Sequence, residues 1–80
     1  MSSLIVLSLS PDEANLNYVK NLPGLKELNI DDNYGLVLIS PKRGLYAIRV
    51  NGEIDLEKLR AIQPKVKGVY PDTPIAPFQT

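Results

Sequence analysis

The hydrophobic pattern of the chain begins with an apolar run, LIVLSL, from Leu4 to Leu9, with serines on both sides. Apolar runs of this length, rich in aliphatic residues, are typical of strands that lie inside a sheet rather than at its edge. We therefore predict a central β-strand at this position.

A helix signal follows directly in the sequence SPDE. Ser10 is a favoured N-cap residue, Pro11 suits the first helical position, and Glu13 completes a capping box. Pro23-Gly24 ends the pattern. We predict a helix over residues 11–22 whose apolar face comprises Ala14, Tyr18, Val19 and Leu22.

The next segment, LKELNI at residues 25–30, alternates apolar and polar positions only in part. This pattern is compatible with an extra short edge strand and with a loop packed against the sheet. Asp31-Asp32-Asn33, which follows, is typical of a turn.

Two β-rich runs at residues 36–39 and 45–50 flank the pentapeptide SPKRG. Pro41 suits the second position of a type I turn, and Gly44 suits the left-handed position that closes it with a bulge. This arrangement predicts a β-hairpin.

A second helix is predicted to begin after Asp55 and to end before Pro64, with Leu56, Leu59 and Ile62 on its apolar face. Residues 66–70 read as a last strand. The segment beyond Asp72 is rich in proline, so it is predicted to be extended and not helical.

The element order is therefore strand, helix, strand, strand, helix, strand. Two right-handed strand–helix–strand units of this kind form an α+β, ferredoxin-like split βαβ fold. We expect a four-stranded antiparallel sheet with two helices on one face and the other face open. Residues 1–72 would form a single domain, and residues 73–80 a C-terminal tail.

The amino-acid composition limits the kinds of catalytic and metal site that the chain can form. The chain has 80 residues, which suits one domain, and it contains no cysteine and no histidine. Disulfides and thiolate metal sites are thereby excluded, and the commonest general base is missing. The apolar N-terminal run is too short to span a membrane and no basic residue precedes it. We expect a small soluble domain located in the cytoplasm.

Nine basic and nine acidic side chains balance, so no net field attracts nucleic acid. The distribution is uneven: residues 1–41 hold two basic and five acidic residues, for a net of −3, and residues 42–80 hold seven and four, for a net of +3. The simplest interpretation of this dipole is solvated surface charge.

RGLYAIRV, at residues 43–50, is similar at its start to the basic-glycine opening of the RNA-recognition octapeptide. In that family aromatic side chains at the third and fifth positions stack on bases. Here these positions hold Leu45 and Ala47, and the first strand has no aromatic residue. Tyr46 is expected to face the helices. An RNA-binding domain is accordingly the least favoured function, because the open face is expected to lack a stacking ring.

No catalytic, metal or cofactor site is predicted. Asp31 and Asp32 do not stand in the frame of a calcium loop, and the carboxylates around Asp55 suit a helix N-terminus. The glycines form no phosphate-binding motif, and no histidine is present to activate a serine. We therefore expect a protein that is not an enzyme.

The open face of the predicted sheet remains as the candidate site. If Tyr46, Ile48 and Val50 face the helices, then Leu45, Ala47 and Arg49 line the open face. An apolar face with a charged rim is typical of a protein-binding surface or a homodimer interface. The alternative is that the C-terminal tail merely covers this face.

The C-terminal half resembles a known family. GLYAI at residues 44–48, DLEKL at 55–59 and VKGVYPD at 66–72 resemble the second half of subtilisin propeptides and of their stand-alone relatives, the small proteinase inhibitors. The resemblance covers residues 36–72. It departs from the family in reading Gly-Leu-Tyr-Ala for the usual Gly-Phe-x-Ala, and in segment 25–33, which looks like an insertion.

The resemblance implies inhibition of a subtilisin-type serine protease. In the family the open sheet face packs on the protease and the C-terminal tail lies in the active-site cleft. Strand addition of this kind draws affinity from main-chain hydrogen bonds and choice from side-chain pockets. The residues implied here are Leu45, Ala47, Arg49, Ile75, Ala76, Pro77, Phe78, Gln79 and Thr80. The alternative from another class is an accessory or regulatory subunit that docks on a larger complex through the same face.

Overall fold

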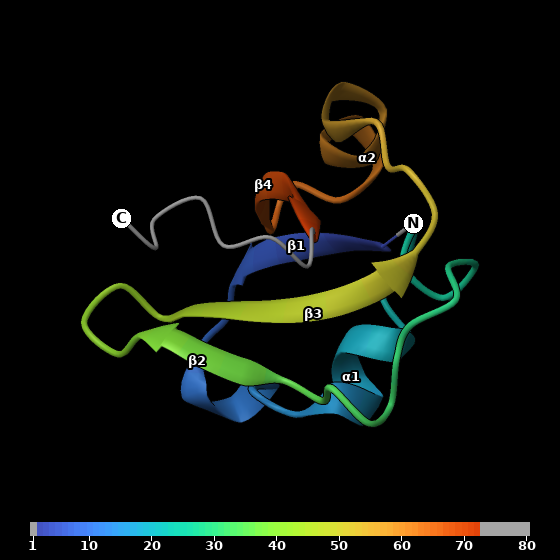
Figure 1. The fold of residues 1–80 in the computed structure, drawn as a ribbon. Coiled ribbons are helices and arrows are strands. Elements are labelled where there is room, and N and C mark those ends of the chain that lie inside the picture. The colour runs from blue at the N-terminus through green and yellow to red at the C-terminus, as the bar shows by residue number, and fades with distance from the viewer. Residues whose placement is uncertain (1, 73–80) are drawn as a thin grey trace, which may run out of the picture.

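The structure is a computed structural model that describes residues 2–72 of the chain. Four strands, two α-helices and one short 3-10 helix follow one another along these residues (Figure 1). In chain order they are β1 (Ser2–Ser8), η1 (Pro11–Glu13), α1 (Leu16–Lys20), β2 (Val37–Ser40), β3 (Leu45–Asn51), α2 (Leu56–Ile62) and β4 (Val66–Asp72).

The four strands form one antiparallel sheet in the order β2-β3-β1-β4. The central position predicted for the first strand is confirmed, since Ile5 of β1 lies opposite Ile48 of β3 and opposite Val69 of β4. This α+β arrangement is consistent with the predicted ferredoxin-like split βαβ fold.

The hydrophobic core lies on one face of this sheet. Ile5 and Leu7 of β1 and Ile48 and Val50 of β3 are fully buried there. Val19 of α1 and Leu59 of α2 belong to the same cluster, so both helices pack on this face. The buried positions alternate along β1, which leaves every second side chain directed to the opposite face.

The single helix predicted over residues 11–22 is wrong. A 3-10 turn ends at Glu13, and α1 begins again only at Leu16. The capping signal is real, since Glu13 Oε1 accepts a hydrogen bond from the Ser10 N–H at 3.0 Å. The interruption arises because Asn15 is extended and its side chain accepts the Tyr18 N–H at 2.7 Å, which makes Asn15 a second N-cap.

The segment 25–30 is a loop, the second of the two structures compatible with its pattern. It forms a single isolated bridge, from Ile30 to Val50 of β3, and its Leu25 side chain is fully buried in the core. The predicted turn at Asp31-Asp32-Asn33 is confirmed, because Asp31 Oδ1 accepts the Asn33 and Tyr34 N–H groups.

The predicted hairpin joins β2 to β3. Gly44 has a φ of 64°, the left-handed value that its place in the turn requires. Its carbonyl also accepts the Leu9 N–H at 2.9 Å, which ties the hairpin to the end of β1. The turn therefore serves both to reverse the chain and to hold two neighbouring strands together.

The second predicted helix is confirmed as α2, and Asp55 accepts the N–H groups of Glu57 and Lys58. Its apolar face is narrower than predicted, because Ile62 is 57% exposed. β4 continues beyond the predicted strand to Asp72. Within residues 2–72, no helix is both long and apolar enough to cross a membrane.

Candidate protein-binding face

The face of the sheet opposite the helices is the candidate site, and we call it the open face. On β1 it carries Leu4 and Val6, which alternate with the buried core residues of that strand. On β3 it carries the residues that alternate with Ile48 and Val50. Tyr46 packs against the core cluster, as predicted, so the sequence assigned the faces of β3 correctly.

The structure places Leu45, Ala47 and Arg49 on the open face with different degrees of exposure. Ala47 is only 3% exposed, because its single methyl group lies between Val6 on one side and Val37 on the other. Ala47 thus forms the floor of the face and offers little surface to a partner. Leu45 and Arg49 are half-buried and remain accessible.

The open face has an aromatic side chain that the sequence analysis missed. Tyr70 lies opposite Leu4 in the β1–β4 register and is 56% exposed. Its ring lies over Gly68, where an added Cβ would be 2.9 Å from Tyr70 Oη. The expectation that this face lacks a ring is therefore wrong. The period-two spacing of Gly68 and Tyr70 in the predicted last strand was the signal that could have found it.

The edge strand β2 extends this apolar surface. Val37, Leu38 and Ile39 are 40%, 50% and 51% exposed. Val37 pairs with Ala47 and therefore continues the open face, whereas Leu38 pairs with Tyr46 and belongs to the other side of the sheet. β2 thus presents apolar side chains on both sides of the sheet at once.

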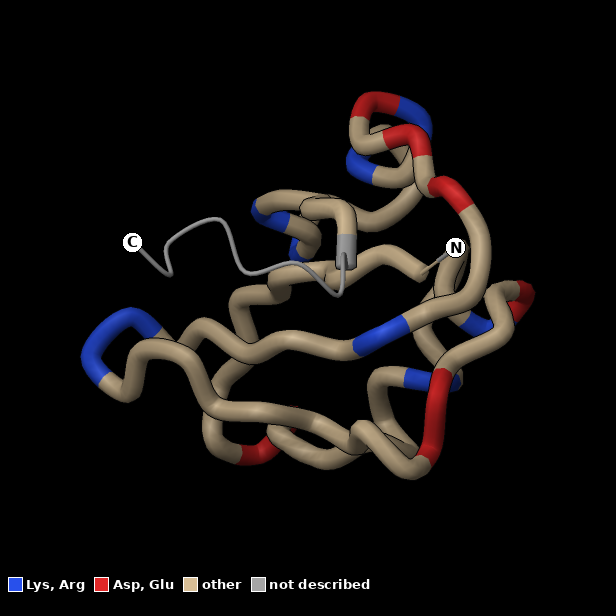
Figure 2. The backbone as a smooth tube through the Cα atoms, in the orientation of Figure 1, with Lys and Arg blue, Asp and Glu red and all other residues tan. Residues whose placement is uncertain are grey.

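Charged groups form the rim of this surface at opposite ends of β2. Lys42 and Arg43 lie in the turn between β2 and β3, and Asp31-Asp32 lie at the other end, where the Asp31 N–H bonds to the Arg49 carbonyl. Figure 2 shows basic positions at the tip of this hairpin and acidic positions at its far end. Asp32 Oδ1 forms an ion pair with Lys20 Nζ at 2.7 Å. Asp31 Oδ2 lies 3.6 Å from Arg49 Nη1. An apolar centre with a charged rim is the composition of many protein-binding surfaces.

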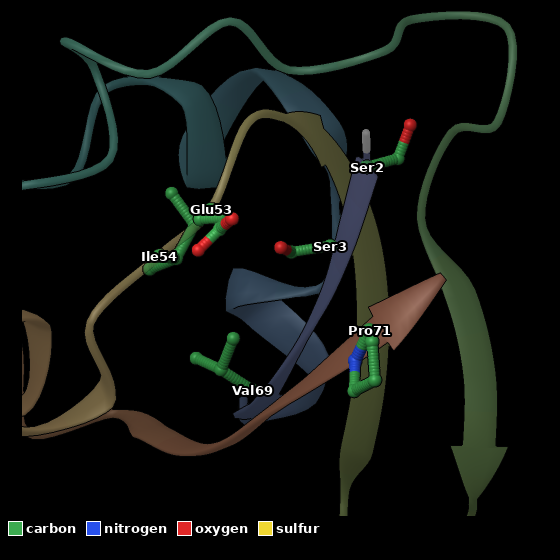
Figure 3. Close-up of a pocket in the computed structure, with 6 residues that line it drawn as sticks. All are labelled: Ser2, Ser3, Glu53, Ile54, Val69 and Pro71. Carbon is green, nitrogen blue, oxygen red and sulfur yellow. The ribbon is translucent and has the colours of Figure 1, made fainter. Parts of the chain in front are cut away.

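A cavity of about 340 Å³ lies at one end of the sheet, lined by Ser2, Ser3, Glu53, Ile54, Val69 and Pro71 (Figure 3). The side chains of Ser3 and Glu53 point into it from different segments of the chain. Ser3 Oγ donates to the Gly52 carbonyl at 2.8 Å. The serine hydroxyl therefore joins β1 to Gly52, the residue that follows β3.

A polar cluster on the helix side joins η1 to the start of β4. Glu13 Oε2 accepts hydrogen bonds from Lys65 Nζ at 2.8 Å and from Tyr18 Oη at 2.9 Å. The Lys65 ammonium, the Ser10 N–H and the Tyr18 hydroxyl lower the pKa of Glu13 to about 2. Glu13 in turn raises the pKa of Lys65 and that of Tyr18. All of these bonds favour the ionised carboxylate, and together they hold η1 against the residue that precedes β4.

The tail residues implied by the family resemblance, from Ile75 to Thr80, lie outside the described residues. No family model matches the chain, and no curated protein or solved structure is significantly similar to it.

Proposed function

We propose that this domain is a non-enzymatic protein-binding module that docks on its partner through the open face. The observation that carries this proposal is the continuous row of Leu4, Val6, Val37 and Tyr70, two of which are at least 40% exposed. A fully solvated role would not require large apolar side chains on the same face of three of the four strands, β1, β2 and β4. The half-buried Arg49 at the rim supplies a polar contact of the kind that accompanies such faces.

The partner we propose is a subtilisin-type serine protease, which the domain would inhibit. Support comes from the resemblance of residues 36–72 to subtilisin propeptides and from a fold of the kind that this family uses. β4 is an edge strand of the sheet and extends to Asp72, the last residue before the proposed inhibitory tail. On this proposal the tail enters the protease cleft, with Phe78 as the side chain that fills a pocket. A cytoplasmic location stays a prediction.

The absence of catalysis is also part of the proposal. Glu13, whose pKa is strongly lowered, accepts three hydrogen bonds and has no remaining role as a base. Ser3 is bonded to a main-chain carbonyl. Both groups are explained by the fold.

The test is a chromogenic-substrate assay of a panel of subtilisin-type proteases, titrated with the intact chain and with a version ending at Asp72. Inhibition by the intact chain, and its loss on truncation, would support the inhibitor proposal. Equal inhibition by both versions would show that residues 73–80 are not needed for inhibition. If neither version inhibits any member of the panel, the inhibitor proposal fails, and an accessory subunit becomes the better interpretation.

A further inference from the structure

The outer edge of β2 carries main-chain groups that have no partner strand among residues 2–72. Within residues 2–72, β2 pairs only with β3 and forms one border of the sheet. A free strand edge is a template for pairing with another strand, and proteins usually protect it with charged side chains, prolines, bulges or a short strand length. β2 has the sequence VLIS and carries no charge.

The exposed apolar side chains of β2 lie on both sides of the sheet, and the open face accounts for those on one side only. Val37 belongs to the open face, but Leu38 lies on the other side of the sheet and is also half exposed. A partner resting on one face would cover only one of them. A strand added along the edge would contact both, because its side chains alternate across the two faces in the same way.

The charges at the two ends of β2 identify the strand that fits. Asp31 lies beside Arg49 of β3, whereas Leu38 lies beside Tyr46, so the acidic end is about 10 Å from Leu38 along the edge. Lys42 and Arg43 occupy the turn on the other side of Leu38. A second β2, running antiparallel and centred near Leu38, brings its own Lys42 and Arg43 to the acidic end.

We propose that the edge of β2 is a self-association surface, on which two copies pair β2 against β2 to form one continuous eight-stranded sheet. The contact is isologous, so the same complementarity of charge occurs at both ends. Asp32 has 65% of its side chain exposed, which allows it to accept a partner lysine or arginine in addition to Lys20. Because the net charge of the chain is zero, two copies do not repel each other through their overall charge. The proposal uses a different surface from the open face and does not depend on protease inhibition.

The geometry also limits the strength of the pair. β2 has only four residues, the register with β3 shifts between Leu38 and Ser40, and Pro41 follows at once. These features shorten the ladder, so the interface falls in the small class, below about 1,200 Å². We expect a weak dimer that is seen at high concentration, with half of the chains paired at about 0.1–1 mM, the range of weak contacts.

Sedimentation velocity of the full chain over a concentration series up to about 1 mM tests the pairing. The expected result is a reversible shift from monomer to dimer. Leu38→Lys should weaken the dimer at least tenfold. Ile62→Lys is the matched control, because Ile62 is 57% exposed on α2, and it should leave the dimer unchanged. Tyr70→Lys, on the open face, should also leave it unchanged.

A charge swap gives an independent variant that does not touch the strand. Lys42→Glu with Arg43→Glu should weaken the dimer several-fold, and adding Asp32→Lys should restore it. Amide hydrogen exchange of residues 37–40 should slow as the concentration rises. A chain that stays monomeric at about 1 mM, or a dimer that survives Leu38→Lys and is lost in Tyr70→Lys, overturns the proposal.

Discussion

The ring of Tyr70 lies over Gly68, two residues earlier in the same strand, so close that a Cβ on the glycine would stand 2.9 Å from Tyr70 Oη. Because Gly68 has no side chain, it leaves a depression on the surface of β4. The Tyr70 ring fills this depression while Tyr70 remains 56% exposed. A flat aromatic surface is thereby held on the open face at little conformational cost, since a tyrosine has few rotatable bonds.

Replacing Gly68 by alanine should displace the ring without unfolding the domain. The contact is made by the far end of a flexible side chain, and alanine suits a strand at least as well as glycine, so we expect the free energy of unfolding to change by less than about 1 kcal/mol. The Gly68 Hα resonance of the parent should show a ring-current shift that Tyr70→Ala abolishes. A normal Gly68 shift in the parent protein would contradict the stacked arrangement.

Alanine substitutions at two glycines with positive φ, Gly35 and Gly44, distinguish the cost of backbone strain from the cost of a steric clash. Gly35 has a φ of 74° with no atom within 4 Å of an added Cβ, so Gly35→Ala should cost about 1–2 kcal/mol from strain alone. Gly44 has a φ of 64°, and its added Cβ would come within 2.8 Å of the Leu9 carbonyl oxygen. Gly44→Ala should therefore be the more destabilising of the two, and Gly44→Val more so again, as measured by urea unfolding. Equal losses for the two alanine variants would show that the collision is relieved at no cost.

Low pH should weaken the ionic contact between Glu13 of η1 and Lys65, which precedes β4. The pKa of Glu13 falls from 4.5 to about 2 on folding. A lowered folded-state pKa stabilises the native state above pH 4.5, and this stabilisation is lost as the pH falls from about 4.5 towards 2. Glu13→Gln removes it at all pH values. The difference in melting temperature between parent and variant should thus be largest near neutral pH and should shrink below pH 4. A difference that is independent of pH would contradict the ionic character of the cluster.

Asn15 is predicted to stabilise the domain as the N-cap of α1. Its side chain accepts the Tyr18 N–H at 2.7 Å, so Asn15→Ala should cost about 0.5–2 kcal/mol in the free energy of unfolding. Asn17 lies inside the same short helix and is the matched control. Asn17→Ala should be neutral or slightly stabilising, because alanine is the better helix former. Chemical denaturation distinguishes the two, and the reverse order would remove Asn15 from this role.

Sequence reasoning succeeded where the signal was local and strong. The hairpin turn was predictable because Pro41 fixes its own φ and Gly44 admits the left-handed conformation that the turn needs. The helix α2 was predictable because Asp55 has the side chain of a helix cap. The first helix was mispredicted because two N-caps, at Ser10 and Asn15, compete over a few residues. Glu13, which belongs to the first cap, also accepts a hydrogen bond from Lys65, a contact that the local sequence pattern does not reveal because Lys65 is far away in the sequence.

The candidate site was only partly predictable for a similar reason. The alternation of β3 assigned Leu45, Ala47 and Arg49 to the open face, but their exposure depends on neighbouring strands. Ala47 is buried by Val6 and Val37, whose positions beside it follow from the register of the sheet. Tyr70 was missed because the open face was defined from residues 45–50 alone, and β4, which pairs with β1 on the other side of the sheet centre, was left out.

The most direct test of the account is an NMR titration of the isotope-labelled chain with subtilisin-type proteases whose active sites are blocked only at the serine hydroxyl. We predict that amide resonances of residues on the open face, Leu4, Val6, Leu45 and Tyr70, broaden or shift on addition of a recognised protease. Resonances of α2 around Ile62, equally exposed on the other side of the sheet, should not change. Changes confined to α2, or no change with any protease, would contradict the proposed docking through the open face.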